Sequence, residues 1–538
     1  MQLVTLQKGR TTRLFWLAAG LVLAVAALTA EQSDPAIIAA GFVVVLASLL
    51  PLYLWLLGWS GGLPIWPVFS LATGMTYALP MIQDSVALRG YTADEIIAGG
   101  MTFVGFVLLG TIVWASLTSR PPRPPRSLLM IEMSHSVRYL LLFVGAGLAF
   151  GLNQLTGLIP MPGNSMQVFR GITGSLSTMG LFVLAFYLGR GLLDKPSAVL
   201  FVAGAVATML MNMTNLMLAQ AAVPMAMVIL GYILGGNRLP WRVLLLLFAV
   251  MAVLHSGKYQ MRASYWSESE SGGKQLTFSM IPAFDAEWFG FGLEELGGWG
   301  QILKGRDAED AQSTLFQRSG NLHMLLLVQK KSPQEVPYCF GATYAPIPRL
   351  LIPRFLDDQK GISHAGNVML SVNYGVLTIE GTQGTSIGWG LLPEAYANFG
   401  YLGIVGLALV LATFYSWITR MTVGVPMTAL RFVIGLLMMG AATTADTMGV
   451  FVTSQFQAII GVSLASMVVM RRQLNPFALK TGEEIKQIVT ETGSNVGLPS
   501  PGILASLIKG QQPQVADQET AGQQAGTRQA ADGAIVRT

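Results

Sequence analysis

Two arginines five positions apart, Arg349 and Arg354, have a clear chemical use in this chain of 538 residues. They lie in segment 344–367, where prolines fix an extended or kinked backbone. A guanidinium group binds phosphate through two parallel hydrogen bonds, and each charged hydrogen bond contributes roughly 1.5–3 kcal/mol. The spacing lets both side chains reach one anionic group. The alternative is that both side chains extend to lipid head groups.

Glu394 and Asn398 are four positions apart at the start of a long apolar segment, so they share one face of a helix. A carboxylate that faces lipid is costly, and we therefore expect Glu394 to face a polar cavity. The glycine-rich stretch 380–386, which begins with Glu380, lacks the Gly-Lys-Ser/Thr ending of a nucleotide-binding loop. Three of the four histidines occur in or beside the long loop 257–391: His255, His323 and His364.

Two further segments place cations beside apolar residues. Segment 258–266 predicts aromatic and basic anchors at a membrane interface, or an Arg262 that faces a cavity and binds an anion. Segment 309–331 carries leucines on one helical line, with Arg318 and His323 on either side of it. Its apolar part is too short to span a membrane, so we expect a helix on the membrane surface or packed on the bundle.

Composition shows which kind of molecule positions these residues. Charged residues make up 11% and apolar residues 52% of the chain, and the mean hydropathy is +0.54. Soluble domains carry roughly 25% charged residues, so the chain is predicted to be an all-α polytopic membrane protein. No basic face stands clear of the membrane flanks, which excludes nucleic acid as a partner. The single cysteine, Cys339, excludes an internal disulfide and a cysteine-cluster metal site, and we expect no metal.

Apolar runs near 20 residues predict about twelve transmembrane helices. The predicted spans are 14–30, 36–57, 63–82, 96–117, 138–158, 171–189, 197–212, 217–235, 241–256, 394–417, 426–445 and 451–470. The first run also fits a signal peptide, although Leu28 is unfavourable three positions before a cleavage site. Between the seventh and eighth spans, the stretch 212–215 (Asn-Met-Thr-Asn) fits either a turn or a polar patch that faces the bundle.

Basic residues between the spans predict the orientation. Outside the long loop and the tail, thirteen of fifteen fall on one side, and only Arg89 and Arg170 fall on the other. The positive-inside rule puts both termini in the cytoplasm and the long loop outside. The chain then divides into a bundle of about nine spans (1–256), a large periplasmic loop (257–391), three C-terminal spans (392–470) and a mostly disordered cytoplasmic tail (471–538).

The order of motifs resembles the bacterial oligosaccharide repeat unit polymerases, the O-antigen polymerase type. The resemblance covers about 315–405, together with the plan of many spans and one large loop near the C-terminal end. It rests on Gln317-Arg318, Pro348-Arg349, Pro353-Arg354, Asp358-Gln359-Lys360 and the run from Pro393-Glu394 through Asn398 to Gly400. Segment 355–361 lacks the Trp and the two Pro that such proteins commonly show there.

The resemblance implies a glycosyltransferase C-like membrane enzyme that acts at the periplasmic face of the inner membrane. Donor and acceptor would both be oligosaccharides on undecaprenyl diphosphate, and no nucleotide or redox cofactor would be needed. Cations would stabilise charge on the diphosphate, and a base would take a proton from the acceptor hydroxyl. The diphosphate ligands would be Arg262, Arg318, Arg349 and Arg354, with Arg170 and Lys360 in reserve. The candidate bases are Glu394, His323, His364 and Glu380.

Other functions stay open on sequence alone. An O-antigen ligase uses the same donor, and a flippase of lipid-linked oligosaccharides is the non-enzymatic alternative. A transporter would be expected to have charged residues inside its spans. Here the spans contain few charged residues, and the long loop contains many. Membrane lipid is an expected partner, and a chain-length regulator and a flippase are candidate partner proteins.

Overall fold

The computed structural model describes most of the chain between residues 30 and 478. The described residues are 30–160, 163–214, 218–236, 240–266, 278–297, 320–352, 357, 360–384, 387–442 and 446–478, with isolated positions between 12 and 27. The chain divides into two compact units, 1–475 and 476–538, and the second is described only at η4 (Pro476–Ala478). The first unit contains the long helices and both strands.

Within the described residues, eight helices are long and apolar enough to cross a membrane. They are α2 (Pro35–Leu56), α3 (Ile65–Ile82), α4 (Ala93–Thr118), α5 (Met133–Thr156), α6 (Gly163–Gly189), α7 (Lys195–Met213), α17 (Leu391–Met421) and α19 (Met448–Val469). Three further apolar helices are shorter: α8 (Leu218–Leu234), α9 (Trp241–Ser256) and α18 (Leu430–Ala441). The chain is therefore a mostly helical, polytopic membrane protein.

Each predicted span after the first coincides with one of these helices. Helix α7 ends at Met213 and α8 begins at Leu218. Asn212 is still within α7, where its Nδ2 donates to Thr208 O at 2.7 Å, and residues 215–217 lie outside the described residues. The first predicted span, 14–30, lies largely outside the described residues. At 12 residues, α18 rises only about 18 Å, less than the roughly 30 Å thickness of a hydrocarbon core.

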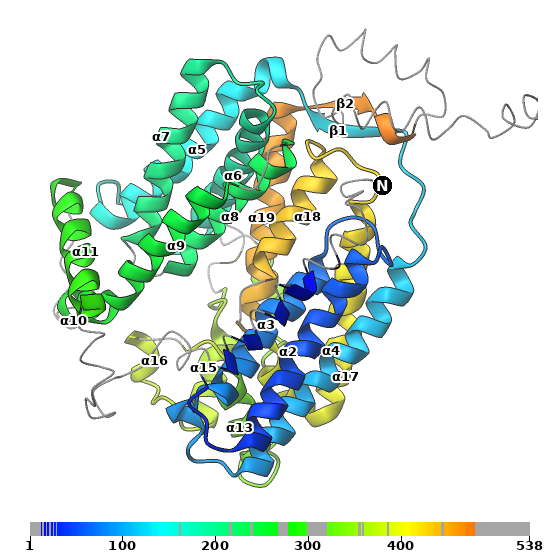
Figure 1. Cartoon of the computed structure of the whole chain (residues 1–538), viewed down its shortest axis with the longest axis vertical. Coiled ribbons are helices and arrows are strands. Elements are labelled where there is room, and N and C mark those ends of the chain that lie inside the picture. Colours follow the sequence, from blue (N-terminus) through cyan, green and yellow to red (C-terminus); the bar gives the residue numbers. More distant parts are fainter. Residues whose placement is uncertain are drawn as a thin grey trace, which may run out of the picture. The chain divides into compact units, whose positions relative to one another are not determined.

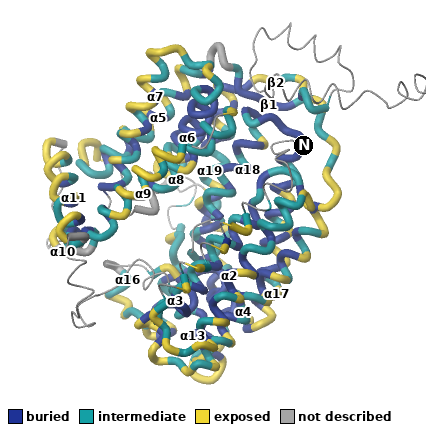
Figure 2. Tube along the Cα trace, viewed as in Figure 1, coloured by how far each residue is buried: buried dark blue, intermediate teal, exposed yellow. Residues whose placement is uncertain are grey.

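The helices pack in two groups joined by α18 and α19 (Figure 1). One group contains α2, α3, α4 and α17, and the other contains α5, α6, α7 and α8. Helix α19 packs on α6, and α18 contacts both α3 and α17. In Figure 2 the residues of α6 are largely buried while α7 and α9 expose many side chains, as expected where apolar side chains face lipid.

A two-stranded sheet lies at one end of the helices, which we call the sheet end. Strands β1 (Ser127–Ile131) and β2 (Met470–Leu474) are antiparallel, and Leu129 pairs with Arg472. Asn475 is fully buried beside the sheet, and its side chain donates to Pro125 O at 2.9 Å and to Gly424 O at 3.0 Å. These bonds tie the chain before β1 to the chain before α18.

The opposite end, which we call the loop end, carries the helices of the long loop (Figure 1). Its elements are η1 (Val86–Leu88), α10 (Lys258–Trp266), η3 (Phe278–Met280), α11 (Ile281–Gly297), α13 (Asn321–Lys331), α14 (Ile347–Leu350), α15 (Ala365–Asn373) and α16 (Gly381–Gly384). The first four residues of α17, from Leu391, are buried among them.

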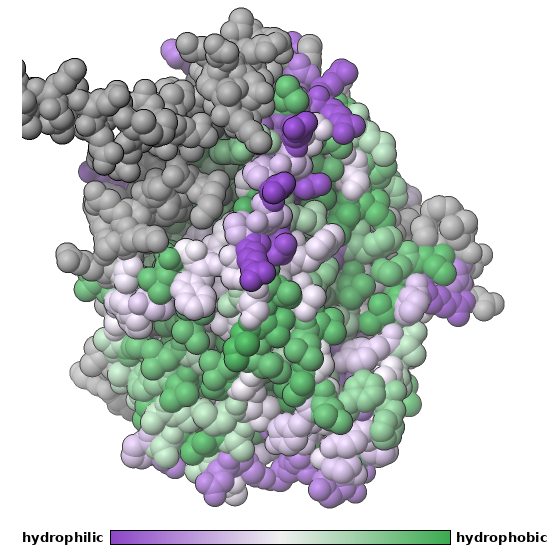
Figure 3. Space-filling model, turned by 90° about the vertical axis from the view of Figure 1, so that its right-hand side faces the viewer, coloured by the Kyte–Doolittle hydropathy of each residue, from purple (hydrophilic) through white to green (hydrophobic). Residues whose placement is uncertain are grey.

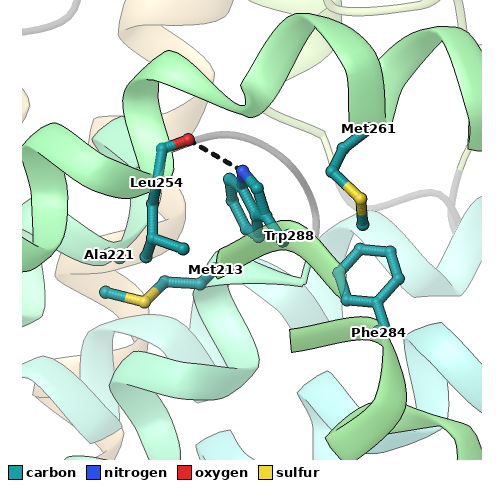
Figure 4. Packing of buried hydrophobic residues seen from close by; sticks show 6 residues of the cluster. All are labelled: Met213, Ala221, Leu254, Met261, Phe284 and Trp288. Atoms are coloured by element: carbon teal, nitrogen blue, oxygen red, sulfur yellow. Dashed lines mark hydrogen bonds between the residues drawn. The ribbon is translucent and has the colours of Figure 1, made fainter. Parts of the chain in front are cut away.

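Helix α11 docks on the bundle through Trp288. The indole Nε1 donates to Leu254 O at 2.7 Å, and the ring lies among buried residues that include Met261 and Phe284 (Figure 4). Because a buried indole N–H must find an acceptor, this bond fixes the docking position.

Helix α13 is a helix packed on the bundle, one of the two alternatives that the leucine spacing predicts. Leu322, Leu325, Leu326 and Val328 are buried, and the helix contacts α3, α4 and α17. The long loop thus folds back onto the spans where the structure describes it.

Candidate functional site

Glu394 lies in a short helical segment set apart from the rest of α17. Phe399 (φ −142°, ψ 15°) and Gly400 (φ 60°, ψ −143°) are non-helical, so residues 391–398 form their own two turns. All eight of these residues are buried. A positive φ with this ψ is accessible almost only to glycine, and Gly400 therefore permits the break.

The carboxylate of Glu394 meets the first turn of α19. Its Oε2 accepts a hydrogen bond from the backbone N–H of Met448 at 2.6 Å, and the residue is fully buried. The first N–H groups of a helix have no partner within the helix, and their partial positive charge favours an anion. This bond engages Oε2. No described group makes a hydrogen bond of ordinary geometry to Oε1, although the Thr343 hydroxyl lies close enough to interact with the carboxylate.

Asn398 fixes the loop 338–344 against this segment. Its Nδ2 donates to Thr343 Oγ1 and to Glu394 O, each at 2.8 Å, and its Oδ1 accepts from Gly341 N at 2.9 Å. The amide thereby uses both donors and its acceptor. Because Thr343 is held in this way, it lies next to the Glu394 carboxylate.

The backbone of Gly366 in α15 lies directly against the Glu394 carboxylate. A β-carbon on Gly366 would lie 3.3 Å from Glu394 Oε1, 3.6 Å from Thr343 Cβ and 3.7 Å from Thr447 Cβ. The Thr447 hydroxyl is also buried and has no hydrogen-bond partner in the described part of the chain. Since buried polar groups are nearly always paired, these two oxygens mark a place suited to a hydrogen-bonding ligand.

A second carboxylate, Asp446, lies next to this group and joins α15 to α19. Its Oδ1 accepts from Asn367 Nδ2 at 2.9 Å and from Thr447 N at 2.8 Å. We call Thr343, Gly366, Glu394, Asp446 and Thr447 the Glu394 junction. Of these residues the sequence predicts only Glu394; the available signal for Asp446 was an acid between two apolar segments.

Arg349 lies on α14, whose Leu350 packs on the first turns of α19 near Gly449. Its side chain is exposed and pairs with Asp357, with Nη2 donating to Oδ1 at 2.8 Å and Nε donating to Oδ2. The hydrogen bonds and charge of Asp357 raise the pKa of Arg349. The guanidinium is thus already oriented by a carboxylate, in the two-bond geometry that it would use for a phosphate.

Lys360 is close to the same segment, and its Nζ donates to Ile352 O at 2.6 Å. Arg318, Arg354 and the side chain of Arg262 lie outside the described residues. Arg170 is in α6, and its Nε and Nη2 donate to the Gln154 amide oxygen at 3.1 and 2.9 Å when that amide is turned to accept. That contact belongs to the α5–α6 pair, so the structure does not place Arg170 in the junction.

The other candidate bases have different surroundings. His364 is the residue before α15, two positions from Gly366, while Glu380 is exposed just before α16. His323 packs edge-on against Tyr91, and its Nδ1 is buried with no partner among the described residues. Burial lowers the pKa of His323, which favours the neutral ring.

Among the described residues, no group of three or more His, Cys, Asp or Glu side chains is arranged to hold a metal ion. The junction instead offers a carboxylate oxygen and a hydroxyl, both able to accept a hydrogen bond. That set can hold a hydroxyl group and accept its proton.

Comparison of the chain with models of protein families, with curated proteins and with solved structures found no match.

Proposed function

We propose that the protein polymerises oligosaccharide repeat units carried on undecaprenyl diphosphate. The observation that carries this proposal is the fully buried carboxylate of Glu394, with one oxygen unpartnered among the described residues, where the long loop meets α17 and α19. The resemblance over 315–405 supplies the substrate class, and the exposed, oriented Arg349 supplies a group suited to its diphosphate.

The proposed topology has twelve spans, cytoplasmic termini and the loop end in the periplasm of a bacterial inner membrane. It follows from the basic residues at the ends of the spans. The described helices fit it, because successive helices run alternately between the sheet end and the loop end (Figure 1). In this topology the Glu394 junction lies on the side where lipid-linked repeat units are joined.

In the proposed reaction, a hydroxyl of the acceptor sugar attacks the anomeric carbon of the donor glycan. A new glycosidic C–O bond forms, and the C–O bond to the diphosphate breaks. Glu394 Oε1 takes the hydroxyl proton, and undecaprenyl diphosphate leaves with the bonding electron pair. Arg349 exchanges Asp357 for the diphosphate and stabilises the charge that develops there.

Glu394 also caps α19, so its role as a base must be separated from a structural role. Glu394→Gln keeps the size of the side chain and can still accept from Met448 N, but an amide cannot accept the proton. A purely structural Glu394 would tolerate this change. A catalytic Glu394 would not, and we expect a loss of roughly 100-fold or more in polymer formation.

The test is gel analysis of surface glycan in a deletion strain that carries wild-type or variant protein. Glu394→Gln and Arg349→Ala should give single-repeat products at wild-type membrane levels. Matched controls are Glu335→Gln, an exposed acid in the same loop, and Arg89→Ala, an exposed arginine at the loop end. Both controls should give normal chain-length ladders.

Other outcomes would overturn the proposal in distinct ways. Long lipid-linked polymer that accumulates in the deletion strain would indicate a ligase. Repeat units that accumulate on the cytoplasmic leaflet would indicate a flippase. Normal ladders with both Glu394→Gln and Arg349→Ala would remove the catalytic roles proposed for these residues.

A further inference from the structure

The structure points to a second binding surface at the sheet end, and we propose that it holds anionic phospholipid head groups. It is formed by the linker 120–126 and the neighbouring face of the β1–β2 sheet. We call it the arginine ridge, and its residues are Arg120, Arg123, Arg126, Leu129, Arg472 and Leu474. The inference does not depend on the proposed polymerase activity.

The linker holds its arginines in a row. In Arg-Pro-Pro-Arg-Pro-Pro-Arg the four prolines fix φ near −65°, and residues before a proline are restricted to extended conformations. A polyproline II chain has three residues per turn and rises about 3.1 Å per residue. This conformation would space Arg120, Arg123 and Arg126 about 9 Å apart along the linker, and all three are exposed.

The linker is also held firmly at both ends. At its start, Arg420 Nη1 donates to Leu117 O at 2.5 Å and to Arg120 O at 3.0 Å. At its end, Asn475 donates from its backbone N–H to Arg126 O at 2.8 Å, in addition to the side-chain bond to Pro125. A charged row on a fixed backbone loses little conformational entropy when it binds a ligand.

The face of the sheet beside the linker continues the row and adds apolar side chains. Arg472 is exposed, and its Nε donates to Ser127 Oγ at 3.0 Å. It lies opposite Leu129, which is 41% exposed, and two residues before Leu474, which is 52% exposed. Exposed leucines around an arginine suit the boundary between acyl chains and head groups.

The arginine ridge carries positive charge that no carboxylate of the described residues neutralises. Among the described residues, no carboxylate pairs with Arg120, Arg123, Arg126 or Arg472, whereas Arg471 on the other face of the strand has Glu132 at 3.6 Å. Figure 3 shows hydrophilic side chains in a band on this side of the molecule, next to a wide hydrophobic area. Cations at the ends of membrane helices lie near the lipid phosphates, and Arg120 follows directly after the end of α4.

The leucines decide between two sources of phosphate. A soluble anion or an acidic peptide would use the arginines alone and would leave Leu129 and Leu474 in water. A phospholipid uses both parts, because its phosphate meets the arginines while its acyl chains cover the leucines. We therefore assign the surface to membrane phospholipid rather than to a soluble ligand.

The test measures lipid retention by native mass spectrometry of the purified full-length protein, delipidated and then exposed to equal amounts of phosphatidylglycerol and phosphatidylcholine. Wild-type protein should prefer phosphatidylglycerol. Each arginine near an anionic surface is worth about a fivefold change in binding, so Arg120→Gln, Arg123→Gln and Arg126→Gln together should weaken that preference on the order of 100-fold.

The matched control carries Arg138→Gln, Lys195→Gln and Arg242→Gln, which remove three exposed cations from the same end of the helices but not from the ridge. An equal loss in this control would overturn the proposal, because any three exposed cations at this end of the helices would then account for the preference for phosphatidylglycerol. The double variant Leu129→Ser, Leu474→Ser should lower retention of both lipids. Loss of bound phosphatidylglycerol to millimolar inorganic phosphate, with no effect of the leucine changes, would show a soluble-anion site instead.

Discussion

Glu394 has one oxygen committed to the backbone of α19 and one oxygen directed at Gly366. The first contact explains how a buried carboxylate is tolerated, because the unpaired N–H of a helix end offsets part of its desolvation. The second contact is what makes the residue useful, since the lone pairs of Oε1 are not used by a backbone donor and can receive a proton from a ligand. The surroundings of Oε1 depend on the missing side chain at position 366.

Gly366→Ala should therefore act on the site without removing any polar group. The new methyl carbon would lie 3.3 Å from Glu394 Oε1, which is tighter than ordinary contact, and would crowd this oxygen. We expect glycan polymerisation to fall about 10- to 100-fold while the protein stays in the membrane. Gly361→Ala is the control, because nothing lies within 4 Å of a β-carbon there. Wild-type ladders with Gly366→Ala would show that no ligand binds at Glu394 Oε1.

His323 gives a pH dependence to the docking of α13. Burial lowers its pKa below the usual value near 6.5, so the unfolded state binds more protons than the folded state as pH falls below that value. Stability from α13 docking should thus be complete above about pH 6.5 and decline below it. Lys330 and Glu95 form an ion pair 3.5 Å apart on the same surface.

Hydrogen exchange of the α13 backbone measures this effect. The amide exchange rates of α13 are divided by the intrinsic exchange rates at each pH. The resulting ratios in wild-type protein should be higher at pH 5.5 than at pH 7.5. His323→Phe keeps an aromatic ring against Tyr91 and cannot be protonated, so it should remove the difference. An unchanged pH dependence in His323→Phe would assign it to another group.

Helix α17 depends on its break at Phe399 and Gly400. The break lets residues 391–398 leave the direction of the span and carry Glu394 to α19, while the remainder from Tyr401 is still long enough to cross a membrane. The space beside Gly400 is also occupied, because a β-carbon there would lie 2.8 Å from Tyr338 Oη. An unbroken helix would move Glu394 away from Met448.

Gly400→Ala should destabilise the protein by about 1–3 kcal/mol, because alanine at φ 60° and ψ −143° is strained. Gly406→Ala, in the same helix and with open space at its β-carbon, should be neutral or stabilising. Thermal unfolding in detergent compares the two variants. Equal melting temperatures would show that the break is not required for the packed state.

The molecule as a whole presents two chemically different ends. The loop end gathers carboxylates, an oriented arginine and hydroxyl groups, whereas the sheet end gathers arginines and exposed leucines. This difference agrees with a membrane protein that works on one face and is anchored at the other. The direction in which it crosses the membrane is a prediction from its span-flanking cations.

Cysteine labelling tests that direction. In a Cys339→Ser background, Glu335→Cys at the loop end and Lys195→Cys at the sheet end are both exposed. An impermeant maleimide added to cells with a permeable outer membrane should label the first at once and the second only after the inner membrane is lysed. The reverse pattern would invert the topology and would place the Glu394 junction in the cytoplasm.

The sequence determined the kind of molecule and most of its helices. An 11% charge content and apolar runs near 20 residues allow few folds other than a helical membrane bundle, because backbone groups in lipid must be satisfied within each helix. The leucine spacing of α13 and the helix face shared by Glu394 and Asn398 could also be predicted from the sequence, since both depend only on the local helical period.

Tertiary structure alone decided which residues meet. Thr343, Gly366, Asp446 and Thr447 come from three separate segments, and no local pattern relates them to Glu394. The break at Gly400 and the close approach of Gly366 to Glu394 follow from how those segments pack, as does the hydrogen bond from Met448 N to the carboxylate. Periodicity is a property of neighbours in the chain, whereas a site is a property of neighbours in space, and only folding brings the second kind together.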